Sequence, residues 1–148
     1  MIYREEQRDL FTVGDDYYLA HCISADFKLG AGIAVEFDKR FDVRRKLFNK
    51  YPNGYIDFMD KYHLEGECIL TDKVLNIITK KRYYHKPVLG SMEEALFVMK
   101  EICVGENIQK VAMPRIGCGL DRLDWEKVRR MVQYIFADTY VEILVCYQ

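Results

Sequence analysis

Four short apolar runs along the chain have the length and composition of buried β-strands: residues 19–23, 74–78, 110–114 and 141–146. Between these runs the spacing of apolar residues changes to that of helices, so strands and helices are expected to alternate. This alternation predicts an α/β fold with a mixed, mostly parallel sheet and helices on both faces. In such sheets, ligands bind beyond the carboxyl ends of the strands.

Three segments carry the apolar spacing of helices. Residues 33–41 follow a glycine-rich turn and place their apolar side chains on one face. Ser91 and Glu94 have the spacing of a capping box, which predicts a helix that begins at Ser91. Asp124 is placed to cap a third helix, whose apolar stripe extends to Phe136. Weaker patterning over residues 55–62 predicts one further short helix.

Length and composition favour one domain, residues 1–148. Half of the 148 residues are hydrophobic, and no repeat or linker divides the chain. The 22 basic and 23 acidic residues are spread along it, for a formal charge of −1, so no global field attracts nucleic acid or an anionic membrane. Any anion must therefore be bound locally.

Targeting signals and cysteine usage give expectations about the compartment. The start of the chain is too polar for a signal peptide, and no apolar run is long enough for a membrane span. The five cysteines include no C-x-x-C pair and lie mostly among apolar residues, as free thiols do in a reducing compartment. We therefore expect a soluble, cytoplasmic protein with neither disulfides nor a metal site. No cofactor or obligate protein partner is evident, and a monomer is the working expectation.

Two glycine loops, residues 30–32 and 115–121, each follow a predicted strand and precede a predicted helix. Each loop can offer backbone amides and a helix N-terminus to a phosphate, and together they indicate a diphosphate. Neither has the G-x-x-x-x-G-K-[ST] pattern of a P-loop or the third glycine of the dinucleotide motif, which weakens the NTPase and dehydrogenase interpretations. A structural explanation stands beside this one, because tight turns need positive φ.

Two charged side chains in these surroundings are candidates for chemistry. Lys80 directly follows a predicted strand and is followed by Lys81 and Arg82. Neighbouring cations favour a neutral amine, which is a nucleophile, although a basic segment can equally be a solvated turn. Asp121 repels phosphate, so a carboxylate there fits a general acid/base aimed beyond the phosphates; capping the next helix is the alternative.

Other reactive residue types have simpler explanations. His21 lies in an apolar strand and His85 in a turn, so both are interpreted as structural. Cys118 lies in the second loop without an identifiable histidine partner, and its small side chain is expected to pack under that loop.

Five motifs occur in order: residues 20–24 (AHCIS), 30–35 (GAGIAV), 78–82 (ITKKR), 85–87 (HKP) and 113–123 (MPRIGCGLDRL). Together they resemble the terminal ADP-ribose protein glycohydrolase branch of the macrodomains. That branch is also called ALC1-like, and it includes the macrodomains of DNA ADP-ribosylation antitoxins. The match extends from about Asp9 to the last strand. The resemblance implies a single three-layer α/β/α macrodomain with an ADP-ribose cleft at the strand ends.

The resemblance also implies a role for each matching residue. Lys80 matches the nucleophilic lysine of the family, and Asp121 matches its acid/base carboxylate. Asp9 would accept a hydrogen bond from the adenine amino group, the first glycine loop would line the diphosphate and distal ribose, and the second loop would enclose the phosphates. The implied ADP-ribose-binding residues are Asp9, Leu10, Ser24, Gly30, Ala31, Gly32, Ile33, Pro114, Arg115, Ile116, Gly117, Cys118, Gly119, Leu120 and Tyr147.

The implied reaction removes mono-ADP-ribose from glutamate or aspartate esters or from DNA bases, with no metal or cofactor; ADP-ribose is the ligand and product. Two other functions stay open: a non-catalytic ADP-ribose reader, and an O-acyl-ADP-ribose deacylase. The near-neutral charge favours protein or small-molecule esters over DNA, although a short single-stranded contact needs only a local patch.

The chain departs from the family pattern at three places. Arg8 precedes Asp9 where relatives usually have glycine, and relatives commonly place an aromatic residue one position before Tyr147. The segment from Tyr51 to Glu67 is longer than the family pattern and is expected to form a lid or a partner surface.

Overall fold

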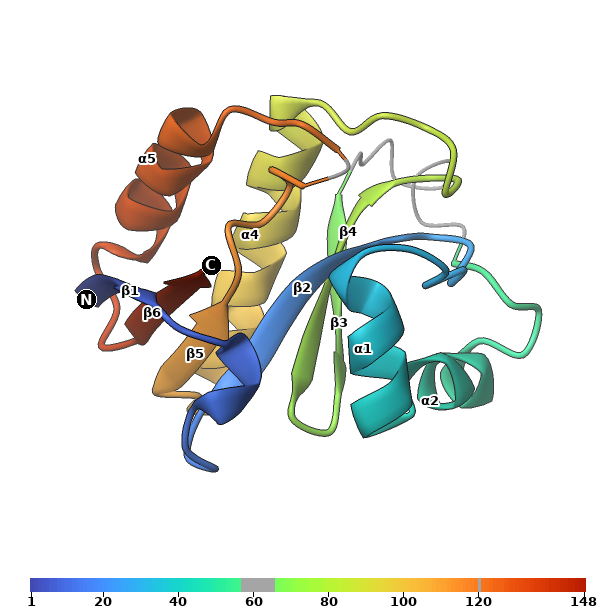
Figure 1. Ribbon diagram of the computed structural model, residues 1–148, viewed down its shortest axis with the longest axis horizontal. Helices are drawn as coiled ribbons and strands as arrows, with labels where there is room; N and C mark the ends of the chain where they lie inside the picture. Colours follow the sequence, from blue (N-terminus) through green and yellow to red (C-terminus); the bar gives the residue numbers. More distant parts are fainter. Residues whose placement is uncertain (57–65, 120) are drawn as a thin grey trace.

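A six-stranded sheet with the order β1-β6-β5-β2-β4-β3 forms the centre of the molecule (Figure 1). The computed structural model describes residues 1–56, 66–119 and 121–148. The strands are β1 (Ile2–Gln7), β2 (Tyr18–Ser24), β3 (Glu67–Thr71), β4 (Val74–Lys80), β5 (Lys110–Met113) and β6 (Glu142–Tyr147). Among the described strands, only β3 runs antiparallel to its neighbour, and every other pairing is parallel. The mixed, mostly parallel sheet and the four predicted strands are confirmed.

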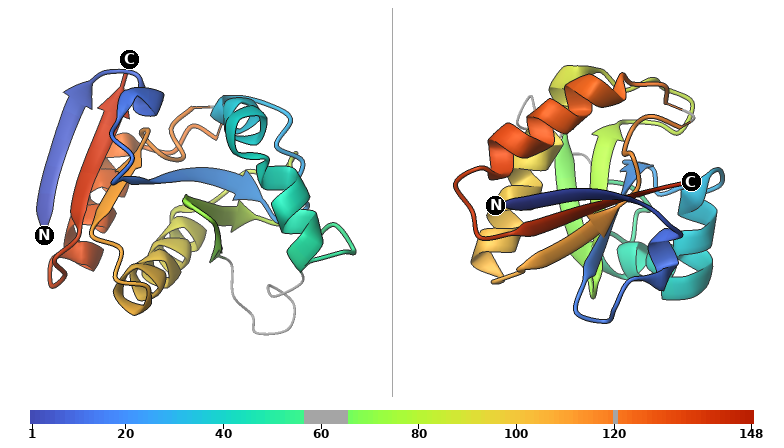
Figure 2. Two further views of the ribbon diagram at one scale, coloured as in Figure 1. Left: turned by 90° about the horizontal axis from the view of Figure 1, so that it is seen from below. Right: turned by 60° about the vertical axis from the view of Figure 1, so that its left-hand side comes forward.

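Helices cover both faces of this sheet, which confirms the three-layer prediction (Figure 2). One face carries α1 (Ile33–Phe41) and α2 (Val43–Lys50), and the other carries α4 (Leu89–Gly105) and α5 (Trp125–Phe136). Each face has its own apolar cluster against the sheet, formed by side chains such as Phe37 and Leu47 on one side and Met99 and Val132 on the other. A 3₁₀ helix, η1 (Leu10–Thr12), follows β1.

The helix starts show one correct and one wrong prediction. Asp124 caps α5 as predicted, because its carboxylate accepts a hydrogen bond from the Glu126 amide at 3.0 Å. The predicted capping box of α4 is wrong, because the helix begins at Leu89 and Ser91 lies inside its first turn. The Ser91 hydroxyl instead accepts from the amide of Val88 at 3.2 Å and donates to the carbonyl of the same residue at 2.8 Å.

The predicted helix over residues 55–62 lies largely outside the described residues, as does most of the predicted lid or partner surface, since residues 57–65 are not among those described. No helix among the described residues has the length and apolarity that a membrane span requires.

The parallel arrangement fixes where the site can lie. Strands β1, β6, β5, β2 and β4 are adjacent and point the same way. Their carboxyl ends therefore lie side by side along one border of the sheet, which we call the carboxyl edge. The residues at or just beyond these ends, in spatial order, are Asp9, Gln148, Pro114, Ser24 and Lys80. Segments from the two ends of the chain are thereby brought into one row.

Candidate active site

An ion pair joins the two residues predicted to carry the chemistry. Lys80 is the last residue of β4, and Asp121 lies in the loop between β5 and α5. The Lys80 Nζ lies 2.7 Å from Asp121 Oδ1, and each side chain is only 15% exposed. A general acid or base must lie within about this distance of the group with which it exchanges a proton. Asp124, not Asp121, caps α5, so the capping explanation for Asp121 no longer applies.

The first glycine loop, residues 30–32, leads from β2 into α1. Gly32 is the N-cap of α1 with φ 63° and ψ −150°, a conformation that is essentially restricted to glycine. Gly30 differs, because a Cβ added there would approach nothing nearer than the Lys28 carbonyl at 3.9 Å. The backbone conformation therefore requires glycine at position 32, whereas an alanine side chain at position 30 would meet no steric obstacle in the fold. Ser24, at the end of β2, is buried and its hydroxyl bonds to Asp26.

The second glycine loop lies beyond β5. Gly117 has φ 75°, and a Cβ there would lie 2.8 Å from both Leu123 Cδ1 and Met92 Cε, so the turn itself requires glycine. A Cβ at Gly119 would meet nothing within 4 Å. Ile116 is buried under the loop. Leu120, which was predicted to contact ADP-ribose, lies outside the described residues.

Cys118, in the same loop, is half-buried, and its thiol donates to the Ile116 carbonyl at 3.3 Å. Burial raises the pKa of Cys118 to about 11, and the nearby Asp124 carboxylate adds to this effect. The thiol is therefore protonated at neutral pH, which fits the packing role predicted for it.

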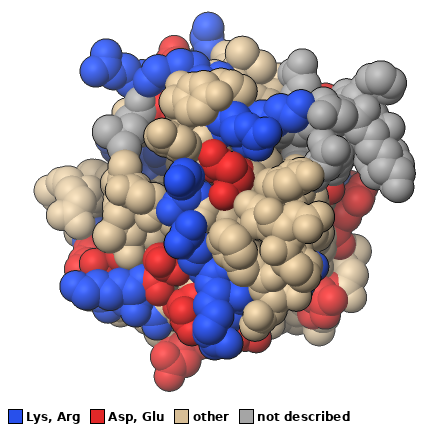
Figure 3. Space-filling view, turned by 90° about the vertical axis from the view of Figure 1, so that its right-hand side faces the viewer, with Lys and Arg blue, Asp and Glu red and all other residues tan. Residues whose placement is uncertain are grey.

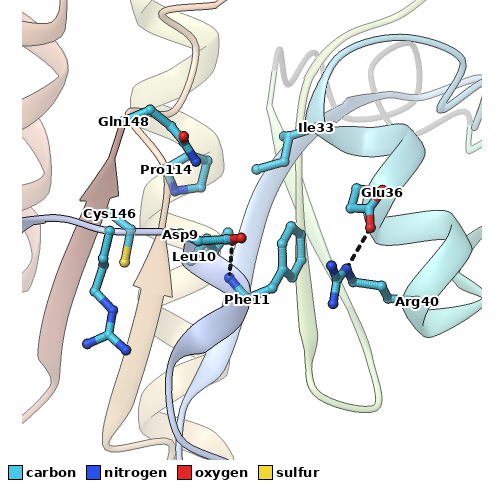
Figure 4. A pocket seen from close by; sticks show the side chains of 10 residues that line it. Asp9, Leu10, Phe11, Ile33, Glu36, Arg40, Pro114, Cys146 and Gln148 are labelled. Atoms are coloured by element: carbon cyan, nitrogen blue, oxygen red, sulfur yellow. Dashed lines mark hydrogen bonds and ion pairs between the residues drawn. The ribbon is translucent and has the colours of Figure 1, made fainter.

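A cavity of about 400 Å³ lies at the β1 and β6 end of the same edge (Figure 4). Its volume is within the range of small-molecule sites. The lining residues are Arg8, Asp9, Leu10, Phe11, Ile33, Glu36, Arg40, Pro114, Cys146 and Gln148. Four of these, Asp9, Leu10, Ile33 and Pro114, were predicted from the sequence. Asp9 Oδ1 accepts a hydrogen bond from the Phe11 amide at 2.9 Å.

The outer wall of this cavity was missed by sequence reasoning. The Arg40 guanidinium lies 4.4 Å from the centroid of the Phe11 ring, and its Nε contacts Glu36 at 2.8 Å. The i,i+4 spacing of Glu36 and Arg40 in the predicted helix could have indicated their ion pair, because residues at this spacing meet on a helix surface. With Arg8 and Asp9 also present, the charges of the lining residues balance. An uncharged polar ring suits such a cavity better than a phosphate does.

Tyr147 is not among the residues that line this cavity. Side chains alternate along β6, so Tyr147 faces away from Cys146 and Gln148, which do line it. The guanidinium of Arg115 instead lies 4.4 Å from the centroid of the Tyr147 ring. The contact brings together two residues that the family resemblance had implied as ligands of ADP-ribose.

The interpretation of His21 as structural fits the geometry, and that of His85 stays a prediction. His21 is buried, stacks on Phe37 with ring centroids 3.9 Å apart, and bonds through Nε2 to Asn76 Oδ1 at 2.7 Å. His85 is exposed, with its ring 4.8 Å from that of Tyr84. Among the described residues, no three His, Cys, Asp or Glu side chains are grouped so that they could hold a metal ion.

Comparison with known proteins places this arrangement in a family. No protein-family model matches the chain. The human ADP-ribose glycohydrolase OARD1 is 40% identical over 138 residues, which cover 93% of this chain and 86% of the human protein. The DNA ADP-ribosyl glycohydrolase of Mycobacterium tuberculosis is 25% identical over 131 residues, or 82% of this chain and 35% of that protein. The macrodomain of Mycobacterium tuberculosis DarG has a TM-score of 0.78 at 23% identity and covers 99% of this chain and 97% of its own. The chain therefore belongs to the macrodomain family, in the branch that contains the ADP-ribose glycohydrolases.

Proposed function

We propose that this protein is an ADP-ribosyl glycohydrolase that releases mono-ADP-ribose from modified substrates, with Lys80 as the nucleophile and Asp121 as the acid/base. The observation that carries the proposal is the 2.7 Å contact between these two largely buried side chains at the carboxyl ends of the strands. A protein that only binds ADP-ribose has no need of an amine and a carboxylate in this arrangement. The name of the human relative agrees with hydrolysis of an ADP-ribosyl bond.

The layout of the edge supports one orientation of the ligand. The cavity beside Asp9 has the size and balanced charge for adenine, with the free oxygen of the carboxylate available to the amino group. The diphosphate then lies between the loops at Gly30 and Gly117, where backbone amides and the α1 N-terminus favour negative charge. The distal ribose reaches Lys80, the last of the strand ends in this row.

The proposed reaction has two steps. Asp121 accepts a proton from the Lys80 ammonium, and the neutral amine attacks the anomeric carbon of the distal ribose. A C–N bond forms while the bond from that carbon to the substrate oxygen or nitrogen breaks, and the leaving group departs with the electron pair. Asp121 passes its proton to the leaving group or to solvent. Water then attacks the anomeric carbon of the lysyl-ADP-ribose adduct while Asp121 takes a proton from the water. The C–N bond to Lys80 breaks with its electron pair going to nitrogen, and the proton returns to the amine, which releases ADP-ribose and restores Lys80.

The test uses the wild-type protein and the variants Lys80→Ala and Asp121→Ala. Each is incubated with a glutamate-linked mono-ADP-ribosylated protein and with an ADP-ribosylated oligonucleotide, and released ADP-ribose is followed by mass spectrometry. We expect either substitution to lower the rate by at least roughly a hundredfold, as is usual for loss of a general acid/base or nucleophile. A matched control is the exposed ion pair of Lys110 and Asp16, which are 2.8 Å apart. This pair lies at the amino-terminal ends of β5 and β2, away from the proposed site, so its alanine variants should retain activity.

Other outcomes separate the remaining functions. If neither substrate is cleaved while free ADP-ribose binds, the hydrolase proposal fails and the protein is an ADP-ribose reader. Cleavage of O-acyl-ADP-ribose alone would identify a deacylase. Release from only one of the two macromolecules would decide between ester and base attachment.

We further propose that the protein acts in the cytoplasm as a monomer. All five cysteines are free thiols, which suits a reducing compartment. The proposed catalytic pair and both glycine loops come from one chain, so the proposed reaction needs no second subunit.

A further inference from the structure

A basic and aromatic segment directly follows the proposed nucleophile. Residues 82–86, Arg-Tyr-Tyr-His-Lys, are all exposed in the loop between β4 and α4, and we call them the 82–86 surface. No acidic residue occurs between Asp72 and Glu93. Lys and Arg side chains also gather in the upper part of the face shown in Figure 3. The chain has no net positive charge, so this concentration is local.

Two tyrosine rings on this surface face solvent. Tyr83 is 56% exposed and Tyr84 is 68% exposed, which is unusual for large aromatic side chains in adjacent positions. Their ring centroids lie 5.3 Å apart at 88°, and the His85 ring lies 4.8 Å from that of Tyr84 at 79°. Lys28 approaches the Tyr83 ring from the neighbouring loop, with Nζ 5.5 Å from the centroid. Aromatic faces and cations are therefore interleaved.

This surface is held against the predicted ribose end of the site. The Tyr83 amide donates to Asp26 Oδ2 at 3.0 Å, and the other carboxylate oxygen of Asp26 bonds to the Ser24 hydroxyl. A turn bond from the His85 amide to the Arg82 carbonyl, 3.0 Å long, shapes the loop. The surface thus begins beside Lys80 and Ser24, at the opposite end of the edge from the cavity near Asp9. In the proposed orientation of the ligand, the group attached to the distal ribose extends toward this surface.

We propose that the 82–86 surface binds a single-stranded nucleic acid that carries the ADP-ribosyl group. The inference rests on the proposed function and names the substrate class for the same site. Base stacking on exposed aromatic rings, combined with cations that follow the backbone, is how proteins hold single strands. An acidic peptide would use the cations but would leave the tyrosine rings without a role. The surface thereby outweighs the near-neutral total charge, which taken alone favours ester substrates.

The direct test measures binding without turnover. Unmodified oligothymidine and oligouridine of about 12 nucleotides, labelled with a fluorophore, are titrated with the protein and followed by anisotropy. We expect the double variant Tyr83→Ala, Tyr84→Ala to weaken binding at least roughly tenfold, since each stacked base is lost. Arg82→Gln with Lys86→Gln should reduce the slope of log affinity against log salt by about 0.7 for each phosphate contact removed. Tyr140→Ala is the matched control, because that side chain is 99% exposed and lies just before β6, at the amino-terminal end of the strand.

A turnover measurement separates this inference from the proposed function. With an ADP-ribosylated oligonucleotide, the tyrosine variant should raise KM and leave kcat unchanged, and it should cleave the glutamate-linked protein as the wild type does. Equal affinity of the wild type and the tyrosine variant for both oligonucleotides would overturn the inference, and so would tighter binding of a polyglutamate peptide than of either oligonucleotide. Neither result would affect the hydrolase proposal, which stands or fails on Lys80 and Asp121.

Discussion

His21 shows how burial sets the chemistry of a single residue. Its ring is buried in β2 against Phe37, and Nε2 donates to the Asn76 side chain, whose amide nitrogen is already donating elsewhere. Burial lowers the pKa of His21 from 6.5 to about 4, although the bond to Asn76 opposes this shift. The folded protein therefore keeps this side chain neutral where the unfolded chain would protonate it.

The resulting prediction concerns acid stability. Between pH 6.5 and 4 the unfolded state binds the extra proton, so the free energy of unfolding falls as the pH falls, by up to roughly 1.4 kcal/mol per pH unit from this residue. Urea unfolding of the wild type and His21→Gln at pH 7, 6, 5 and 4.5 measures how the free energy of unfolding depends on pH. The variant should be less stable at pH 7 and approach the wild type on acidification. Exposed His85→Gln should follow the wild type throughout, and a constant difference between wild type and His21→Gln would contradict the prediction.

The sequence predicted the residues of the site better than their contacts. Lys80 ends β4 and Asp121 lies in the glycine loop beyond β5, and both were named from their motifs. Their 2.7 Å contact follows once both segments lie at the carboxyl ends of the parallel strands, while their catalytic roles stay predictions. The Arg40 contact with Phe11 depends on how η1 packs against α1, which no local pattern records. The alternation of side chains along β6, by contrast, follows from the strand itself, and it directs Cys146 rather than Tyr147 into the cavity.

At the scale of elements, the missed segments are those that bury few apolar side chains. β1 reads Ile-Tyr-Arg-Glu-Glu-Gln and lies at one edge of the sheet, where Glu5 pairs with Arg129 of α5 at 2.7 Å. Only Val43 and Leu47 of α2 are buried. Such elements are specified by tertiary pairing more than by periodicity. Helices α4 and α5 bury more apolar side chains than α2 does. Helix α1 buries only two residues, as α2 does, and its prediction depended on the glycine turn before it.

Asp124 allows a test of element stability. Removing the N-cap leaves the Glu126 amide without its 3.0 Å acceptor, so Asp124→Ala should lower the free energy of unfolding by about 1 kcal/mol, whereas Asp124→Asn should retain most of it. Urea unfolding at pH 7 measures the difference. Asp138→Ala, beyond the other end of α5, is the control: its side chain is 75% exposed, so its ion pair with Lys100 is screened by solvent and should contribute less than the cap does. Equal effects at both positions would show that the cap is not formed.

At the scale of the whole molecule, parallel strands turn a linear series of motifs into one continuous edge. Asp9 and Gln148, near the two ends of the chain, lie at adjacent strands because β1 pairs with β6. A ligand that spans this edge from the cavity to Lys80 contacts residues from both halves of the sequence. Because the site forms only when these segments come together, ligand binding should raise the free energy of unfolding of the whole domain.

The last prediction uses this linkage to locate the diphosphate. ADP-ribose at about 100 times its Kd adds roughly 2.7 kcal/mol to folding and should raise Tm by several degrees. Gly30→Ala should leave the unliganded Tm unchanged or slightly raised, because the added Cβ meets only the Lys28 carbonyl at 3.9 Å. If the diphosphate passes against that backbone, the methyl group intrudes, and the shift with ADP-ribose shrinks.

Two controls make differential scanning fluorimetry decisive here. Adenosine lacks the diphosphate, so its smaller shift should be equal in the wild type and Gly30→Ala. Gly117→Ala should lower Tm even without ligand, because its φ of 75° and its 2.8 Å approach to Leu123 Cδ1 strain the turn. An undiminished ADP-ribose shift in Gly30→Ala would place the diphosphate away from the first loop, and the orientation proposed for the ligand would have to be reversed or moved.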